Sequence, residues 1–153
     1  MTDSFSAFGK TARQRKVFFL IIVAIALVLI LAWPTTTTQS PFWEVWVVDE
    51  VGQPLEGMTV TLFYQNYSAE SEGHSEQKRT DAGGYVVFPQ RSLKASRLRR
   101  IVTTLQSAGA GVHASFGPHA HARVDGNGLT GYTTDWTGAP ARMSSTVVVS
   151  PSD

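Results

Sequence analysis

The stretch "VHASFGPHAHARV", residues 112–124, decides how this chain is to be interpreted, because its residues alternate strictly in character. The even positions are apolar: Val112, Ala114, Phe116, Pro118, Ala120, Ala122 and Val124. The odd positions are polar or small: His113, Ser115, Gly117, His119, His121 and Arg123. Such alternation is typical of a half-buried β-strand, whose side chains point to opposite faces in turn. We therefore expect a strand with its apolar face on a core and its histidines outside.

The next segment, "DGNGLTG" at 125–131, contains the pattern G-x-G-x-x-G. A nucleotide-binding loop with this pattern leaves a strand and opens a helix, whereas "YTTDWTGAP" follows here with no helical period. Asn and Gly adopt left-handed backbone conformations readily. The sequence therefore predicts a tight turn at 125–128, with Asn127 and the glycines in that conformation.

Short β-branched and aromatic runs separated by turn residues continue through the rest of the chain after Pro41. Further strands are expected at 42–50, 58–65, 97–105 and 144–150, with a strand–turn–strand hairpin at 77–89 that turns at 81–84. Many short strands with regular turns indicate a sandwich or barrel. The predicted fold class is all-β, an Ig-like or transthyretin-like β-sandwich over residues 42–153, with one N-terminal transmembrane helix.

"VFFLIIVAIALVLILAW", residues 17–33, has no charged or polar side chain. As a helix it would reach about 26 Å, close to the thickness of a hydrocarbon core of about 30 Å. Basic residues precede it, namely Lys10, Arg13, Arg15 and Lys16, and the first charge after it is Glu44. The positive-inside rule then predicts a basic cytoplasmic tail at 1–16, a signal anchor in the lipid bilayer at 17–33, and a periplasmic or extracellular C-terminal domain.

A cleaved signal peptide has the same basic-then-apolar pattern and is the alternative for this segment. Ala32 is the best candidate for a cleavage site, but Ile30 occupies the position two residues before it. Trp33 at the boundary favours a retained anchor, since Trp is enriched at membrane interfaces. "PTTTTQSP", residues 34–41, has bounding prolines and no apolar period, and is expected to be an extended Thr/Pro spacer.

Two further segments carry a family resemblance. "VVDEVGQPLEGMTVTL" has turn and core residues at Val47, Asp49, Gly52, Pro54, Gly57 and Val60, and "TDAGGYVVF" has them at Thr80, Asp81, Gly84 and Phe88. Over about residues 46–89 the chain resembles the carboxypeptidase regulatory-like domain, a transthyretin-like β-sandwich often found in exported proteins. The resemblance implies a folding, spacing or binding unit and no catalytic residues.

Several function classes lack their sequence signals. The chain has no cysteine, which excludes a disulfide scaffold and thiol chemistry. It contains no H-x-x-E, H-E-x-x-H or G-x-S-x-G pattern, and its net charge of +1 is no nucleic-acid signature. We therefore expect no catalytic residue, no cofactor and no nucleic-acid partner.

Three groups of residues remain as candidate sites. His113, His119 and His121 are alternative metal ligands, although Arg123 on the same face would repel a cation, so no metal site is favoured. A basic cluster with no acidic residue could bind an anionic partner such as a lipid headgroup, a polysaccharide or an acidic protein face; it comprises Arg91, Lys94, Arg97, Arg99 and Arg100. The same charges could instead keep an edge strand from pairing. Tyr132 and Trp136 could form a carbohydrate platform if both were exposed.

Together these observations predict a membrane-anchored extracytoplasmic accessory or interaction module without catalytic activity. Its expected partners are the bilayer and a protein of the cell envelope. A metal-binding protein and a carbohydrate-binding module are the two alternatives.

Overall fold

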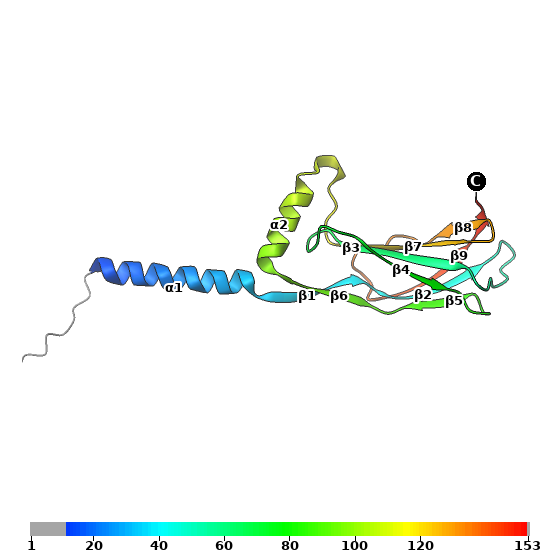
Figure 1. The fold of residues 1–153 in the computed structure, drawn as a ribbon, viewed down its shortest axis with the longest axis horizontal. Coiled ribbons are helices and arrows are strands. Elements are labelled where there is room, and N and C mark those ends of the chain that lie inside the picture. Colours follow the sequence, from blue (N-terminus) through cyan, green and yellow to red (C-terminus); the bar gives the residue numbers. More distant parts are fainter. Residues whose placement is uncertain (1–11, 153) are drawn as a thin grey trace, which may run out of the picture. The chain divides into compact units, whose positions relative to one another are not determined.

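The computed structural model describes residues 12–152, so most of the predicted cytoplasmic tail at 1–16 lies outside the described residues. The chain divides into two compact units, one up to Trp33 and one from Pro34 onward. The first contains helix α1, Ala12–Ala32, and the second contains every strand that the structure describes (Figure 1). Each unit is described by itself.

Helix α1 is apolar on all sides from Val17 onward, and none of residues 13–32 is buried. Within the described part of the chain it is the one helix long and apolar enough to cross a membrane, over the 20 residues Arg13–Ala32. It begins before the predicted boundary at residue 17 and ends at Ala32, which leaves Trp33 outside it. The chain thus has an N-terminal apolar helix that could insert in a membrane as a signal anchor or a signal sequence.

The second unit is mostly β, as predicted, and forms three sheets. The strands are β1 (Pro34–Ser40), β2 (Phe42–Val48), β3 (Thr59–Asn66), β4 (His74–Arg79), β5 (Tyr85–Phe88), β6 (Arg91–Ser96), β7 (Pro118–Gly126), β8 (Leu129–Tyr132), β9 (Arg142–Val148) and β10 (Ser150–Pro151). A five-stranded sheet has the order β10-β8-β7-β3-β4, a three-stranded sheet the order β5-β2-β9, and β1 pairs with β6. The β2–β9 pair is parallel, and the other pairs are antiparallel.

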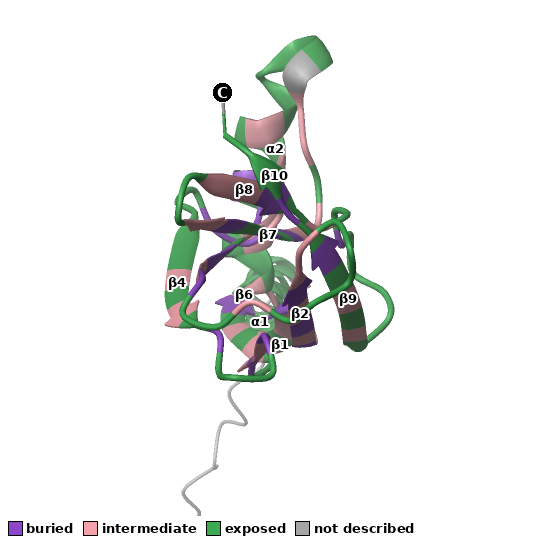
Figure 2. Cartoon of the chain, turned by 90° about the vertical axis from the view of Figure 1, so that its right-hand side faces the viewer, coloured by how far each residue is buried: buried purple, intermediate pink, exposed green. Residues whose placement is uncertain are grey.

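One core joins the five-stranded and three-stranded sheets (Figure 2). Alternate residues of their central strands are fully or almost fully buried in it: Trp43, Val45 and Val47 of β2, Val60 and Leu62 of β3, and Ala120, Ala122 and Val124 of β7. Burying one Val or Leu side chain contributes about 1.5–3 kcal/mol. The period of two therefore orients each strand, as the sequence predicts.

The predicted alternation at 112–124 holds only from Pro118, where β7 begins. Residues Gly111–His113 form a short 3₁₀-helix, η1, and Val112 is 96% exposed. At the other end the predicted turn is confirmed, because Asn127 (φ 52°) and Gly128 (φ 73°) are left-handed and connect β7 to β8. The G-x-G-x-x-G pattern thus belongs to the turn of a β-hairpin.

The predicted turn at 81–84 is present, but the predicted hairpin is wrong. The Asp81 carboxylate accepts hydrogen bonds from the backbone N–H groups of Gly83 and Tyr85, both at 2.9 Å. A Cβ on Gly84 would lie 2.5 Å from the Val47 carbonyl oxygen, so only glycine fits there. The flanking strands do not pair, because β4 lies at the edge of the five-stranded sheet and β5 pairs with β2. This turn carries the chain from one sheet to the other.

Two other segments differ from the predictions. Residues 34–40 of the expected spacer are strand β1, which pairs with β6 from Pro34↔Ser96 to Ser40↔Arg91. Residues 97–105, expected as a strand, lie in helix α2, Arg97–Ala108, so the fold is not purely β (Figure 1). Ser96 caps this helix, since its hydroxyl accepts from the Arg99 N–H at 3.2 Å. The β-branched content of "RIVTT" suggested a strand and concealed the helical spacing of its apolar residues.

Candidate functional site

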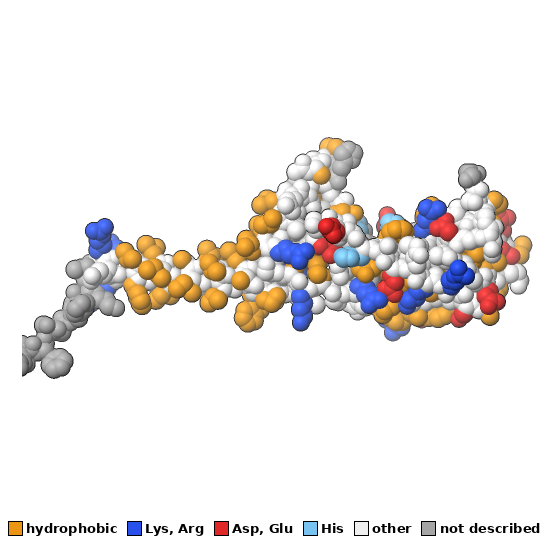
Figure 3. All heavy atoms as spheres, viewed as in Figure 1, with side chains coloured by type: hydrophobic (Ala, Val, Ile, Leu, Met, Phe, Trp, Pro, Cys, Tyr) orange, Lys and Arg blue, Asp and Glu red, His pale blue; other side chains and the backbone are white. Residues whose placement is uncertain are grey.

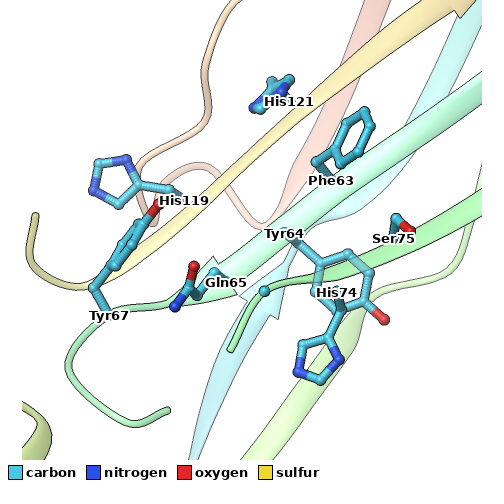
Figure 4. Close-up of a pocket in the computed structure, with 9 residues that line it drawn as sticks. Phe63, Tyr64, Gln65, Tyr67, His74, Ser75, His119 and His121 are labelled. Atoms are coloured by element: carbon cyan, nitrogen blue, oxygen red, sulfur yellow. The ribbon is translucent and has the colours of Figure 1, made fainter. Parts of the chain in front are cut away.

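A hollow of about 290 Å³ lies at one end of strands β3, β4 and β7, and its lining residues come from both faces of the five-stranded sheet (Figure 4). Its lining combines aromatic rings with histidines and small polar side chains: Phe63, Tyr64, Gln65, Tyr67, Gly73, His74, Ser75, His119 and His121. These residues come from β3, β4, β7 and the loop between β3 and β4. The hollow is the place in the domain where most of the histidines converge.

The pairing of β3 with β7 brings together the side chains of one half of the hollow. Phe63 pairs with His121, and Gln65 pairs with His119, across the β3–β7 ladder. The Phe63 and His121 rings stack with centroids 5.3 Å apart and planes at 25°. The edge of one ring meets the face of the other between Tyr67 and His119, at 5.3 Å and 78°. We call Phe63, Gln65, Tyr67, His119 and His121 the histidine–aromatic face.

Polar groups lie next to both histidines of this face. His119 Nε2 lies 3.0 Å from the Phe116 carbonyl oxygen, a contact that it makes as a hydrogen-bond donor. In the neutral ring Nδ1 is then left as an acceptor. His121 Nδ1 lies 3.8 Å from the Asp135 carboxylate, and both of these side chains are largely exposed. The face therefore offers both ring surfaces and hydrogen-bonding atoms to a ligand.

A buried carboxylate supports the other half of the hollow. Glu70 is 6% exposed, and its oxygens accept from the Gln39 amide at 2.8 and 2.9 Å and from the Asn66 backbone N–H at 2.8 Å. His74 Nε2 lies 2.8 Å from the same carboxylate, and the His74 ring stacks on Tyr64 at 5.3 Å. These four contacts satisfy the Glu70 carboxylate and connect it to β1, β3 and β4. Its role is therefore structural.

The three histidines predicted as alternative metal ligands do not all share a strand. His119 and His121 point outward from β7, as their parity predicts, whereas His113 lies in η1, before that strand begins. Over the described residues 12–152, no group of three or more His, Cys, Asp or Glu residues could hold a metal ion. The face thus presents two imidazoles beside aromatic rings.

Seven lining residues were not among the sequence candidates: Phe63, Tyr64, Gln65, Tyr67, Gly73, His74 and Ser75. Phe63 and Gln65 have the outward parity of β3, which the sequence did show. Their pairing with His121 and His119 follows from the β3–β7 register, which no local pattern encodes. Tyr67 and His74 flank a loop, where strand parity gives no direction.

The predicted basic cluster is divided in the structure. Arg91 hydrogen-bonds Glu76 at 2.6 and 3.2 Å, and this bond raises the pKa of its guanidinium. Arg100 donates to the Thr35 carbonyl oxygen at 3.0 Å. Lys94 on β6 and Arg97 and Arg99 on α2 are exposed. Strand β6 pairs with β1 on one side only, so it is an edge strand, as the alternative interpretation expects, whereas Arg97, Arg99 and Arg100 lie in helix α2.

The predicted platform of Tyr132 and Trp136 does not form. Trp136 is 1% exposed, belongs to the core, and donates from Nε1 to the Pro140 carbonyl oxygen at 2.7 Å. Tyr132 is 60% exposed, with the Arg123 guanidinium 5.7 Å from its ring centroid. The reason is a bridge between Trp136 and Ala120, which holds the segment 133–141, between β8 and β9, against the core.

No family model and no curated protein sequence matches the chain. Among solved structures it is similar to 3-chlorocatechol 1,2-dioxygenase from Rhodococcus opacus 1CP, at 13% identity and a TM-score of 0.48, over 93% of this chain and 90% of that one. It is also similar to chlorocatechol 1,2-dioxygenase from Pseudomonas putida, at 14% identity and a TM-score of 0.42, over 90% and 87% of the two chains.

These findings correct the resemblance to the carboxypeptidase regulatory-like domain over residues 46–89. No model of that family matches, and the two solved structures named above are chlorocatechol dioxygenases. The motif residues Asp49, Gly52, Asp81 and Gly84 all form turns here. Turns of this chemistry occur in β-proteins of many families, which is why the motif misled.

Proposed function

We propose that the chain is a single-pass membrane protein whose C-terminal domain is a periplasmic or extracellular β-sandwich. The domain serves as an accessory or interaction module for a protein of the cell envelope and performs no catalysis. The observation that carries the proposal is helix α1, whose apolar side chains are exposed on every side, including Phe19 at 65% and Leu29 at 62%. A helix that is hydrophobic all round requires an apolar surrounding.

Two further observations support the proposal. Arg13, Arg15 and Lys16 stand at the N-terminal end of α1, and the first charge after it is Glu44, which favours a cytoplasmic N-terminus. The core shared by a five-stranded and a three-stranded sheet supports the sandwich. In this arrangement the outer sheet faces are available for binding.

A topology experiment tests the proposal. A reporter that is active only in the cytoplasm, fused after Asp153, is expected to be silent, and the chain should stay with membranes through alkaline extraction. Reporter activity would contradict the orientation. Release of a shorter chain starting near Trp33 would show a cleaved signal sequence in place of an anchor.

The histidine–aromatic face favours a second candidate function, the binding of a sugar. Its rings offer stacking surfaces, and its histidines and Gln65 offer hydrogen bonds around a hollow of about 290 Å³. Binding sites for small ligands combine these features. A glycan array tests it: Tyr67→Ala should abolish any signal, and Tyr132→Ala, on the same sheet but outside the hollow, should retain it. If the chain bound zinc in the absence of any sugar, and His119→Ala abolished that binding, the metal alternative would be favoured.

A further inference from the structure

The polar side of helix α2 contacts the β-domain and its apolar side is exposed to solvent, which is the reverse of an ordinary surface helix. Arg100 donates to the Thr35 carbonyl oxygen of β1 at 3.0 Å, and Ser107 donates to the Tyr67 carbonyl oxygen at 3.0 Å. Thr103, between them on the same side, is the buried residue of the helix at 7% exposure. The two hydrogen bonds and the burial of Thr103 orient the helix about its axis.

The opposite side carries four exposed apolar residues, Leu98 at 51%, Ile101 at 48%, Val102 at 45% and Leu105 at 66%. Their spacing is i, i+3, i+4 and i+7, and at about 100° per residue they form one stripe centred opposite Arg100, Thr103 and Ser107. Figure 3 shows hydrophobic side chains along the outer side of this helix. We call these four residues the apolar stripe. In water such a stripe is unfavourable, which indicates that it is covered in use.

Positive charges flank the stripe. Arg97 and Arg99 are exposed, and at about 100° per residue they fall on either side of it. Residues 97–108 contain no acidic residue. A stripe bordered by arginines suits a helix lying in the plane of a bilayer, where the apolar side enters the acyl boundary and the guanidinium groups reach anionic headgroups.

Chain connectivity keeps the first turn of α2 close to the chain that leaves α1. Ser96, the N-cap of α2, pairs with Pro34 in the β1–β6 ladder. Trp33 alone separates Pro34 from the end of α1 at Ala32. A membrane that holds α1 is therefore the nearest extended apolar phase to the stripe.

We propose that the apolar stripe of α2, with Arg97 and Arg99, binds the surface of an anionic phospholipid bilayer, the same membrane that α1 spans. This inference rests on the proposed function in one respect, namely that α1 is a retained anchor. The bilayer is favoured over a protein partner because it accounts for the stripe, for the arginines on both sides of it, and for the location of α2 next to the strand that follows α1.

The depth of α2 in a bilayer can be measured with spin labels on single introduced cysteines, because the full chain has no cysteine of its own. Ile101→Cys and Leu105→Cys would each carry a spin label on the stripe. Gln106→Cys, exposed on the same helix but off the stripe, is the matched control. In vesicles of mixed anionic and zwitterionic phospholipid, the labels at 101 and 105 should be several-fold less accessible to a water-soluble relaxation agent than the label at 106. Replacing Arg97 and Arg99 with Gln should reduce this difference in anionic vesicles.

Each outcome decides between the alternatives. Labels at 101 and 105 that are as accessible as the one at 106, in a chain that remains in the vesicles, would overturn this inference and leave the anchor intact. Protection that disappears as the protein is diluted in lipid would show a second copy of the chain on the stripe, and would also overturn it. Protection unaffected by the two arginine changes would overturn the assignment to anionic lipid. Loss of the whole chain from the vesicles would contradict the anchor and this inference together.

Discussion

Helices α1 and α2 both expose apolar side chains, but they differ in what lies on their other sides. In α1 apolar residues surround the axis, whereas in α2 they occupy one side and the opposite side is hydrogen-bonded to the β-domain. The first arrangement suits a helix surrounded by lipid acyl chains, and the second a helix lying at an interface. Exposed apolar residues on a helix therefore indicate different environments, according to whether the opposite side of the helix contacts the protein.

The largest effect is expected from placing charge in α1. Val23→Arg with Leu27→Arg should prevent membrane retention, because each arginine at the centre of a spanning helix costs about 2.5–3.5 kcal/mol of insertion free energy. The measurement is the fraction of the chain that remains with membranes after alkaline extraction.

The matched variant places the same two arginines in α2, at Ile101 and Leu105. It should remain fully in the membrane fraction, because α1 still anchors it. If the α2 variant were released and the α1 variant retained, the roles assigned to the two helices would be exchanged.

A smaller effect is expected from the side of α2 that faces the protein. Arg100→Gln removes a hydrogen bond from a charged donor to the Thr35 carbonyl oxygen, which should lower the free energy of unfolding by about 1.5–3 kcal/mol. Urea unfolding of the full chain in non-ionic detergent can be followed by tryptophan fluorescence, since Trp43 and Trp136 are buried. Arg97→Gln, which changes the same residue type on the exposed side, should alter stability by less than about 0.5 kcal/mol. Equal effects would contradict the orientation of the helix.

The cap of α2 should matter somewhat less. Ser96→Ala removes the hydroxyl that accepts from the Arg99 N–H and is expected to cost about 1 kcal/mol. Hydrogen exchange of the α2 amides should accelerate while the core strands stay protected. Ser92→Ala, an exposed serine on the same strand, is the control and should leave α2 unchanged. Uniform acceleration through the domain would show that α2 does not unfold separately.

The smallest effect is expected on the apolar stripe itself. Leu105→Ala should change the stability of the domain by less than about 0.5 kcal/mol, since Leu105 is 66% exposed. Leu62→Ala in the core, at 0% exposure, should cost about 2–5 kcal/mol in the same assay. A comparable loss from both leucines would place Leu105 in the core and remove the basis for a lipid-binding stripe.

Sequence periodicity predicted the elements that are apolar throughout or that alternate between a buried and an outer face. Residues 17–32 are uniformly apolar, and Met58, Val60 and Leu62 alternate with their neighbours, so each segment carries its own evidence. The turn at 125–128 was also predictable, because left-handed conformations at Asn127 and Gly128 need those residue types. In these places local preference and tertiary structure agree.

The predictions were wrong where contacts between residues distant in the sequence determine the secondary structure. "PTTTTQS" has no apolar pattern of its own and becomes a strand only because β6 pairs with it. "RLRRIVTTL" has the β-branched residues of a strand, but the Ser96 cap and the hydrogen bond from Arg100 to the Thr35 carbonyl oxygen stabilise a helix. The histidine–aromatic face could be predicted only in part, since strand parity gave the direction of His119 and His121 but not their neighbours across the ladder.

The β1–β6 ladder has a mechanical consequence. The chain leaves little slack after α1, because a single residue, Trp33, precedes the first paired residue, Pro34. Tension between an anchored α1 and the domain would be carried along β1 and would load its hydrogen bonds with β6. If these bonds broke, the seven residues of β1 would release about 23 Å of chain, at about 3.3 Å per residue, and the domain could then reach partners farther from its anchor.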